Sequence, residues 1–176
     1  MKRRFVALLL ALLTGLAGGC KPSAGAPPVA TAPGVPPLPT RAQPRLPTIK
    51  LYLGAQEMIT EMALTPLQQE TGMMFRTNMA ENNGMIFPLP YPMHASFWMK
   101  NCPLPLSAAY IDPGGNIVEI HDFRAQDTNS VVATSGNIQF VLETPQGWFQ
   151  RNGVSTGAVI TTEKGSLAKT FFGREP

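Results

Sequence analysis

The side chains best suited to binding chemistry lie between positions 76 and 102. An aromatic ring, a cation and an amide follow one another closely at Trp98, Lys100 and Asn101. In a strand, Trp98 and Lys100 would share one face, because side chains alternate between faces. With Arg76 converging on it, this surface would bind a small anion or a saccharide. The structural alternative is that Trp98 covers a sheet and Lys100 packs its aliphatic stem along apolar neighbours.

Sulfur-containing side chains form a second candidate set. Apart from Met1, all eight methionines lie between Met58 and Met99. Thioethers bind Cu(I), so Met93, His94 and Cys102 are candidate metal ligands. The alternative is that the methionines fill irregular gaps in an apolar core. The spacing predicts no other cofactor.

Catalytic motifs give little support for an enzyme. The sequence contains no Gly-x-Ser-x-Gly elbow, phosphate-binding loop or Cys-x-x-Cys pair. An enzyme would have to use Arg76, Lys100 and Asn101 with an acidic residue such as Asp112, or Cys102 with a histidine as its base. We therefore assign no catalytic residue and expect a binding protein.

The first nineteen residues have the order of an export signal. Lys2, Arg3 and Arg4 precede nine uninterrupted apolar residues, 5–13, and small residues precede Cys20. A membrane-spanning helix needs about 20 apolar residues, so a cleaved signal fits better than an uncleaved anchor.

Cys20 refines this interpretation. The segment 1–19 resembles a bacterial lipoprotein signal, in which the cysteine after the small residues is acylated and becomes the mature N-terminus. The resemblance implies an exported protein that is anchored in a membrane and faces the periplasm or the cell surface. Lys21, in place of an aspartate that resembles a retention signal, favours the outer membrane.

Removal of the signal changes the charge and the cysteine chemistry. Without Lys2, Arg3 and Arg4 the basic residues fall from 14 to 11, which equals the 11 acidic residues. The basic character of the whole chain is therefore no reason to expect nucleic acid as a partner. Acylation of Cys20 leaves Cys102 as a lone thiol, which excludes an intrachain disulfide.

A tether and one domain follow the signal. Residues 21–47 contain nine of the 18 prolines, and such a segment is too poor in bulky apolar residues to fold. We expect residues 20–47 to be a lipidated cysteine with a proline-rich tether. The domain would span residues 48–161, followed by a polar C-terminal extension, 162–176.

Turn residues divide the domain into short elements. A Thr-Pro-Leu-Gln sequence starts a helix at 65–68, and a Pro-Gly-Gly turn joins two strands within 108–121. A strand is predicted at 138–143, a short helix at 145–151 and a late strand at 158–161. These elements predict a mainly β (α+β) domain, a compact barrel or sandwich with one or two short helices.

Several motifs resemble a known family, the domain of unknown function 192. In sequence order they are Leu-Thr-Pro at 64–66, Glu-Thr-Gly-Met-Met-Phe-Arg at 70–76, Gly-Met-Ile-Phe at 84–87, Phe-Trp-Met-Lys-Asn at 97–101, Pro-Leu-Pro-Leu at 103–106 and Val-Leu-Glu at 141–143. The resemblance covers about residues 49–160. It implies a small β-rich domain, often exported, and no settled activity.

Three positions depart from that family pattern. Ser107 and Ala158 stand where the family has aspartates, and Cys102 stands where threonine is usual. If the family's aspartates take part in a common reaction or binding function, this chain would lack that function. If they only cap turns, their replacement would have little effect.

Together these features predict a membrane-tethered module of the cell envelope. We expect it to be non-catalytic and to bind a small ligand or an envelope protein, with the membrane reached through the lipid anchor. The alternatives are a Cu(I)-handling protein that uses the methionine-rich segment 58–99, and an enzyme of undefined reaction.

Overall fold

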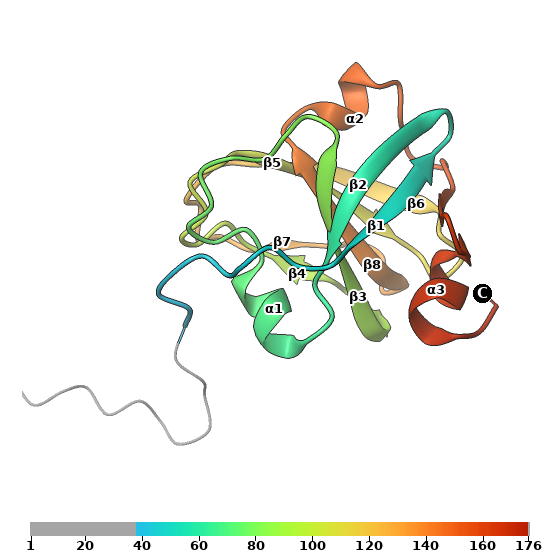
Figure 1. The fold of residues 1–176 in the computed structure, drawn as a ribbon, viewed down its shortest axis with the longest axis horizontal. Helices are drawn as coiled ribbons and strands as arrows, with labels where there is room; N and C mark the ends of the chain where they lie inside the picture. The colour runs from blue at the N-terminus through green and yellow to red at the C-terminus, as the bar shows by residue number, and fades with distance from the viewer. Residues whose placement is uncertain (1–37, 176) are drawn as a thin grey trace, which may run out of the picture. The chain divides into compact units, whose positions relative to one another are not determined.

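Short runs of β-branched and aromatic residues, separated by turns, build this domain (Figure 1). The computed structural model describes residues 38–175. Within them the strands are β1 (Thr48–Leu53), β2 (Gln56–Met62), β3 (Asn83–Met93), β4 (Ser96–Phe97), β5 (Leu106–Ile111), β6 (Ile117–Phe123), β7 (Val131–Val132), β8 (Ile138–Pro145), β9 (Ile160–Thr162) and β10 (Gly165–Ser166). The helices are α1 (Pro66–Thr71), α2 (Trp148–Arg151) and α3 (Leu167–Phe172).

Eight of these strands form one curled sheet in the order β10-β9-β1-β2-β3-β8-β5-β6. The β2–β3 pair is parallel, and the other neighbours are antiparallel. The sheet is not closed, but Ile117 N donates to Ala158 O at 2.9 Å and so links the start of β6 to the segment before β9. The expected mainly β, barrel-like or sandwich-like class is confirmed.

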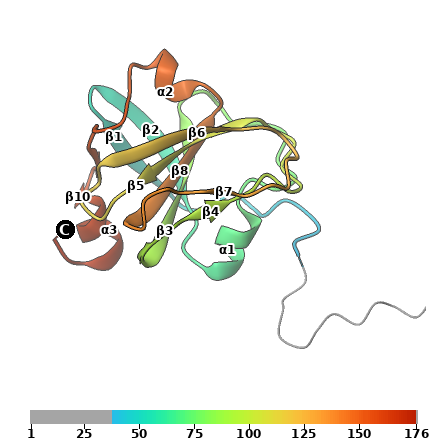
Figure 2. The same ribbon diagram turned by 180° about the vertical axis from the view of Figure 1, so that it is seen from behind.

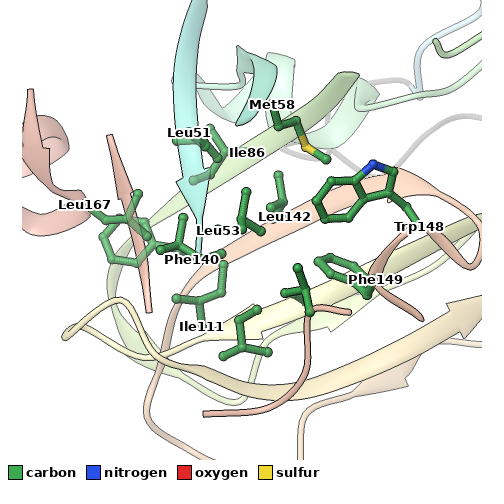
Figure 3. Close-up of a cluster of buried hydrophobic side chains, with 14 of the residues drawn as sticks. Leu51, Leu53, Met58, Ile86, Ile111, Phe140, Leu142, Trp148, Phe149 and Leu167 are labelled. Atoms are coloured by element: carbon green, nitrogen blue, oxygen red, sulfur yellow. The ribbon is translucent and has the colours of Figure 1, made fainter. Parts of the chain in front are cut away.

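Apolar side chains cover both faces of the central strands. On β8, Phe140 and Leu142 belong to one buried cluster, whereas Ile138 and Val141 belong to a second one. Figure 3 shows the first cluster, in which the Trp148 indole lies beside Met58, Leu142 and Phe149. Because β8 is covered on both faces, any polar side chain on it is buried.

Helix α1 begins and ends as its sequence predicts. The Thr65 hydroxyl accepts from Gln68 N, and the Gln68 side chain accepts from Thr65 N, which completes a capping box. Pro66 occupies the first turn, and Gly72 ends the helix at a φ of 43°. Figure 2 shows α1 beside β4 and β7, away from α3.

The C-terminal segment is more ordered than its polar composition suggests. The two helices predicted from the sequence are present, as α1 and α2, and α3 is a third that the sequence analysis did not place. Ser166 caps α3 by accepting from Lys169 N. Phe171 and Phe172 pack on the first cluster, with Phe172 5.6 Å from the Phe140 ring. Residues 165–172 are thus part of the packed domain.

Ser107 acts as a structural cap, not as a surface group. It is almost fully buried, its hydroxyl accepts from Gly147 N at 2.8 Å, and it donates to the Asp122 carboxylate. The hydroxyl therefore joins β5, β6 and the start of α2. This agrees with the turn-capping interpretation of the aspartate that the family pattern has here.

No helix among residues 38–175 is long and apolar enough to cross a bilayer. The predicted signal, Cys20 and most of the predicted tether lie outside the described residues.

Candidate functional site

A cavity of about 300 Å³ opens on the α1 side of the sheet, against the second apolar cluster. Exposed residues mark its rim, and buried residues mark its floor. The rim includes Pro66, Glu70, Ser96 and Trp98. Most of the remaining walls are apolar or carry sulfur: Met73, Met74, Phe87, Leu89, Phe97, Met99 and Leu106.

Glu143 supplies a carboxyl group to this floor, whose other buried side chains are apolar or carry sulfur except for Thr71. It lies on β8 between Met85 of β3 and Ala108 of β5, in the middle of the sheet. Only 4% of its surface is exposed, and its Oε2 has no hydrogen-bond partner among the described residues. Loss of water around the buried carboxylate raises the pKa of Glu143 to about 8. At neutral pH the group is therefore mainly a neutral carboxylic acid.

Sequence reasoning placed Glu143 in a family motif but gave it no role. A usable signal was present, because an acidic residue follows the apolar run Phe140–Leu142 inside a predicted strand. The sequence alone does not show that Glu143 is buried. Its burial follows only from the pairing of β8 on both sides and the apolar clusters on both of its faces.

Cys102 lines the same cavity but is a poor nucleophile. Its thiol is buried and donates weakly to Leu104 O at 3.5 Å. Burial raises the pKa of Cys102 to about 11, and a backbone hydrogen bond from Leu104 only partly offsets this. His94 Nδ1 bonds to Ala133 O and His121 Nε2 bonds to Glu119, and neither ring is among the residues that line the cavity. The structure thus does not assemble a cysteine–histidine pair here.

Trp98 and Lys100 lie together at the cavity, although they follow β4 and are not in a strand. Regular pairing of β4 ends at Phe97, yet the alternation continues, because Met99 is buried and Trp98 is 36% exposed. Lys100 Nζ lies 5.2 Å from the centre of the Trp98 ring. Both side chains therefore offer a ligand an aromatic surface next to a cation.

Asn101 supports this arrangement through its backbone. Its φ of 58° is left-handed, a conformation in which asparagine is enriched among non-glycine residues. Its carbonyl accepts from Phe75 N at 2.7 Å, which fixes the Lys100 turn against the segment after α1. The Asn101 side chain is not among the cavity-lining groups.

Arg76 does not join the other predicted ligand-binding residues. Its guanidinium forms two bonds to the Glu61 carboxylate, at 2.6 and 2.9 Å, and one to Pro44 O. Burial raises the pKa of Glu61, but hydrogen bonds from Arg76 and Leu46 N outweigh it and lower that pKa overall. This ion pair lines a separate, smaller pocket and ties β2 to the segment before β1.

The predicted metal ligands are only partly brought together. No group of three or more His, Cys, Asp or Glu side chains within residues 38–175 could hold a metal ion. Met93 and His94 do not line the cavity with Cys102, whereas Met73, Met74 and Met99 do. Met58 belongs to the first apolar cluster, and Met62 packs against that cluster.

The acidic partner suggested for an enzyme is also elsewhere. Asp112 accepts from Asn116 N at 2.8 Å and from its side-chain amide, which closes the turn between β5 and β6. Neither Arg76 nor Asp112 lines the cavity that holds Lys100.

Residues 50–162 match the model of the domain of unknown function 192 family, DUF192, described as "Uncharacterized ACR". The chain belongs to this family.

The solved structures that resemble the domain include two bacterial proteins. One is a Sinorhizobium meliloti 1021 protein described as a proposed transcription regulator, with 28% identity, a TM-score of 0.65 and coverage of 69% of this chain and 98% of that one. The other is a protein of unknown function from Novosphingobium aromaticivorans DSM 12444, with 28% identity, a TM-score of 0.61 and coverage of 65% and 85%. No curated protein matches the chain.

The buried carboxyl predicts an unusual dependence of stability on pH. An unfolded chain titrates Glu143 near its ordinary value of 4.5, whereas the folded chain titrates it near 8. Between these values only the folded state keeps the proton, so the free energy of unfolding should fall by roughly 1 kcal/mol per pH unit as pH rises. Glu143→Gln should remove this contribution.

Urea unfolding between about pH 5 and 8 measures the effect. Glu163→Gln, which changes an exposed carboxyl, is the matched control and should keep the wild-type slope. Equal slopes for wild type and Glu143→Gln would contradict the prediction.

Proposed function

We propose that this protein is a lipid-anchored module of the bacterial cell envelope that binds a small ligand in the α1 cavity. The observation that carries the proposal is the Glu143 carboxyl, which lies at the floor of a cavity and whose Oε2 has no hydrogen-bond partner within residues 38–175. A buried polar group without a partner costs about 1–3 kcal/mol, and a ligand that bonds to it recovers part of that cost.

The cavity has the general properties of a small-molecule site. Its volume of about 300 Å³ is at the lower end of ligand pockets, and its walls are mostly apolar with a few polar groups. Trp98 and Lys100 at the opening would orient a ligand by stacking and by hydrogen bonding. Binding is favoured over catalysis because the Cys102 thiol stays protonated and the Arg76 guanidinium is already paired.

Ligand binding should depend on the rim of the cavity. In crystals of the protein soaked with a library of small organic fragments, we expect bound fragments to gather between α1 and the Trp98–Lys100 turn. Trp98→Ala or Lys100→Ala should weaken the binding of any such fragment severalfold in solution. Tyr91→Ala and Lys164→Ala, at exposed sites that do not line the cavity, are the matched controls. Fragments that bind only elsewhere would argue against the proposal.

The anchor is proposed from the sequence alone. Cys20, preceded by a signal and followed by a proline-rich segment, supports a diacyl or triacyl anchor with a spacer. Mass spectrometry of the protein from bacterial membranes should find a mature chain that begins with acylated Cys20. Cys20→Ala should move the protein to the soluble fraction. A mature chain that retains Met1 would contradict the anchor.

A second candidate function is the binding of Cu(I). Its specific support is that Met73, Met74, Met99 and Cys102 line one cavity, which places three thioethers and a thiol around the same space. Titration with Cu(I) under reducing conditions should then give a Kd below about 1 μM, weakened by Met73→Leu and Met99→Leu together. Met79→Leu, which lines the other pocket, is the control. Binding no tighter than micromolar would exclude this candidate.

A further inference from the structure

The charged and titratable groups around Glu143 leave its carboxyl without a counter-charge. From α1 the cavity receives Glu70, and from the β4–β5 connection it receives Lys100 and Cys102. No ion pair joins Lys100 to Glu143 within residues 38–175, and Lys100 Nζ lies over the Trp98 ring instead. Cys102 and Tyr110 are themselves kept protonated by burial, in the proximity of Glu143. The floor of the cavity is therefore uncharged at neutral pH.

A neutral carboxylic acid has a distinct hydrogen-bonding pattern. It offers one O–H donor and one carbonyl acceptor side by side, whereas a carboxylate only accepts. A primary carboxamide has the complementary pair, an acceptor oxygen beside an N–H donor, and can form two bonds with the acid at once. A hydrocarbon group forms neither bond, so it would leave the Glu143 carboxyl without a hydrogen-bond partner.

Charged ligand groups fit this floor less well. An ammonium would need Glu143 to lose its proton, and it would then form an ion pair among apolar walls, where desolvation offsets the attraction. A carboxylate at the floor would lose its hydration and gain one charge-assisted bond from Glu143, and Lys100, which lies over the Trp98 ring at the opening, makes no ion pair with the Glu143 carboxyl among the described residues. The walls formed by Phe87, Phe97 and the methionines suit an apolar or aromatic body.

We infer that the α1 cavity selects an uncharged, apolar-bodied small molecule that ends in a carboxamide-like group, and that Glu143 is the residue that determines this specificity. The inference rests on the proposed ligand-binding function and adds the class of ligand to it. Glu143 acts here as a hydrogen-bonding acid that recognises one end of the ligand, while Trp98 and Lys100 close over the other.

Four probes that share a phenyl ring and differ in one group test this inference. They are benzamide, benzoate, benzylamine and toluene, titrated into the purified full-length protein at about pH 6.5 and followed by NMR through the Trp98 indole N–H. We expect benzamide to bind at least about fivefold more tightly than each of the others, which is what one additional satisfied hydrogen bond provides.

Variants of Glu143 distinguish what its carboxyl group contributes to ligand binding from what the rest of the cavity contributes. Glu143→Gln keeps a donor beside an acceptor, so it should retain the preference for benzamide. Glu143→Leu should bind benzamide no more tightly than toluene, and Glu163→Gln should change nothing. Wild-type affinity for benzamide should fall as the pH is raised above about 8, where Glu143 loses its proton, and Glu143→Gln should not show this fall.

Each outcome decides between the two proposals. If toluene binds as tightly as benzamide, or if benzoate or benzylamine binds most tightly, the cavity is a ligand site but the inferred specificity is wrong. If none of the four probes binds and soaked fragments also avoid the cavity, both the specificity and the proposed function are wrong.

Discussion

The burial of one carboxyl group at the centre of the sheet shapes the rest of this structure. Glu143 lies on β8, which pairs with β3 on one side and β5 on the other, so its backbone cannot move to bring the side chain to water. Burial removes solvation that a carboxylate needs, and no cation among the described residues replaces it. The group is stable there only as a neutral acid, and only a space beside it can supply a hydrogen-bond partner.

The surrounding elements keep that space open. Helix α1 is short, begins at a capping box and ends at Gly72, whose φ of 43° is a backbone conformation that favours glycine. Asn101 holds the Trp98–Lys100 turn against the residues after α1. One residue after Phe75, the Arg76–Glu61 pair fixes the same segment to β2. Of the four predicted ligand-binding residues, Trp98 and Lys100 face the cavity. Arg76 and Asn101 instead position its walls.

Much of the fold follows from local sequence signals. The capping box at 65–68, the Pro-Gly-Gly turn between β5 and β6 and the apolar run of β8 are all short-range patterns, and all three were predicted correctly. Helix α3 was missed because a polar segment hides two phenylalanines whose partner, Phe140, lies some thirty residues earlier. The role of Glu143 and the pairing of Arg76 with Glu61 depend on strands that meet only in three dimensions, so spacing alone could not supply them.

Direct titration of the Glu143 carboxyl tests the central claim. Carbon-13 NMR of the side-chain carboxyls, with Glu143→Gln to assign the resonance, reports its protonation in the folded protein without any ligand. The buried Glu143 side chain should be a carboxylic acid at neutral pH and titrate at about 8. A Glu143 carboxyl that titrates near 4.5 in the folded protein would mean that water or a cation reaches it, and would contradict both the neutral floor and the ligand class inferred from it.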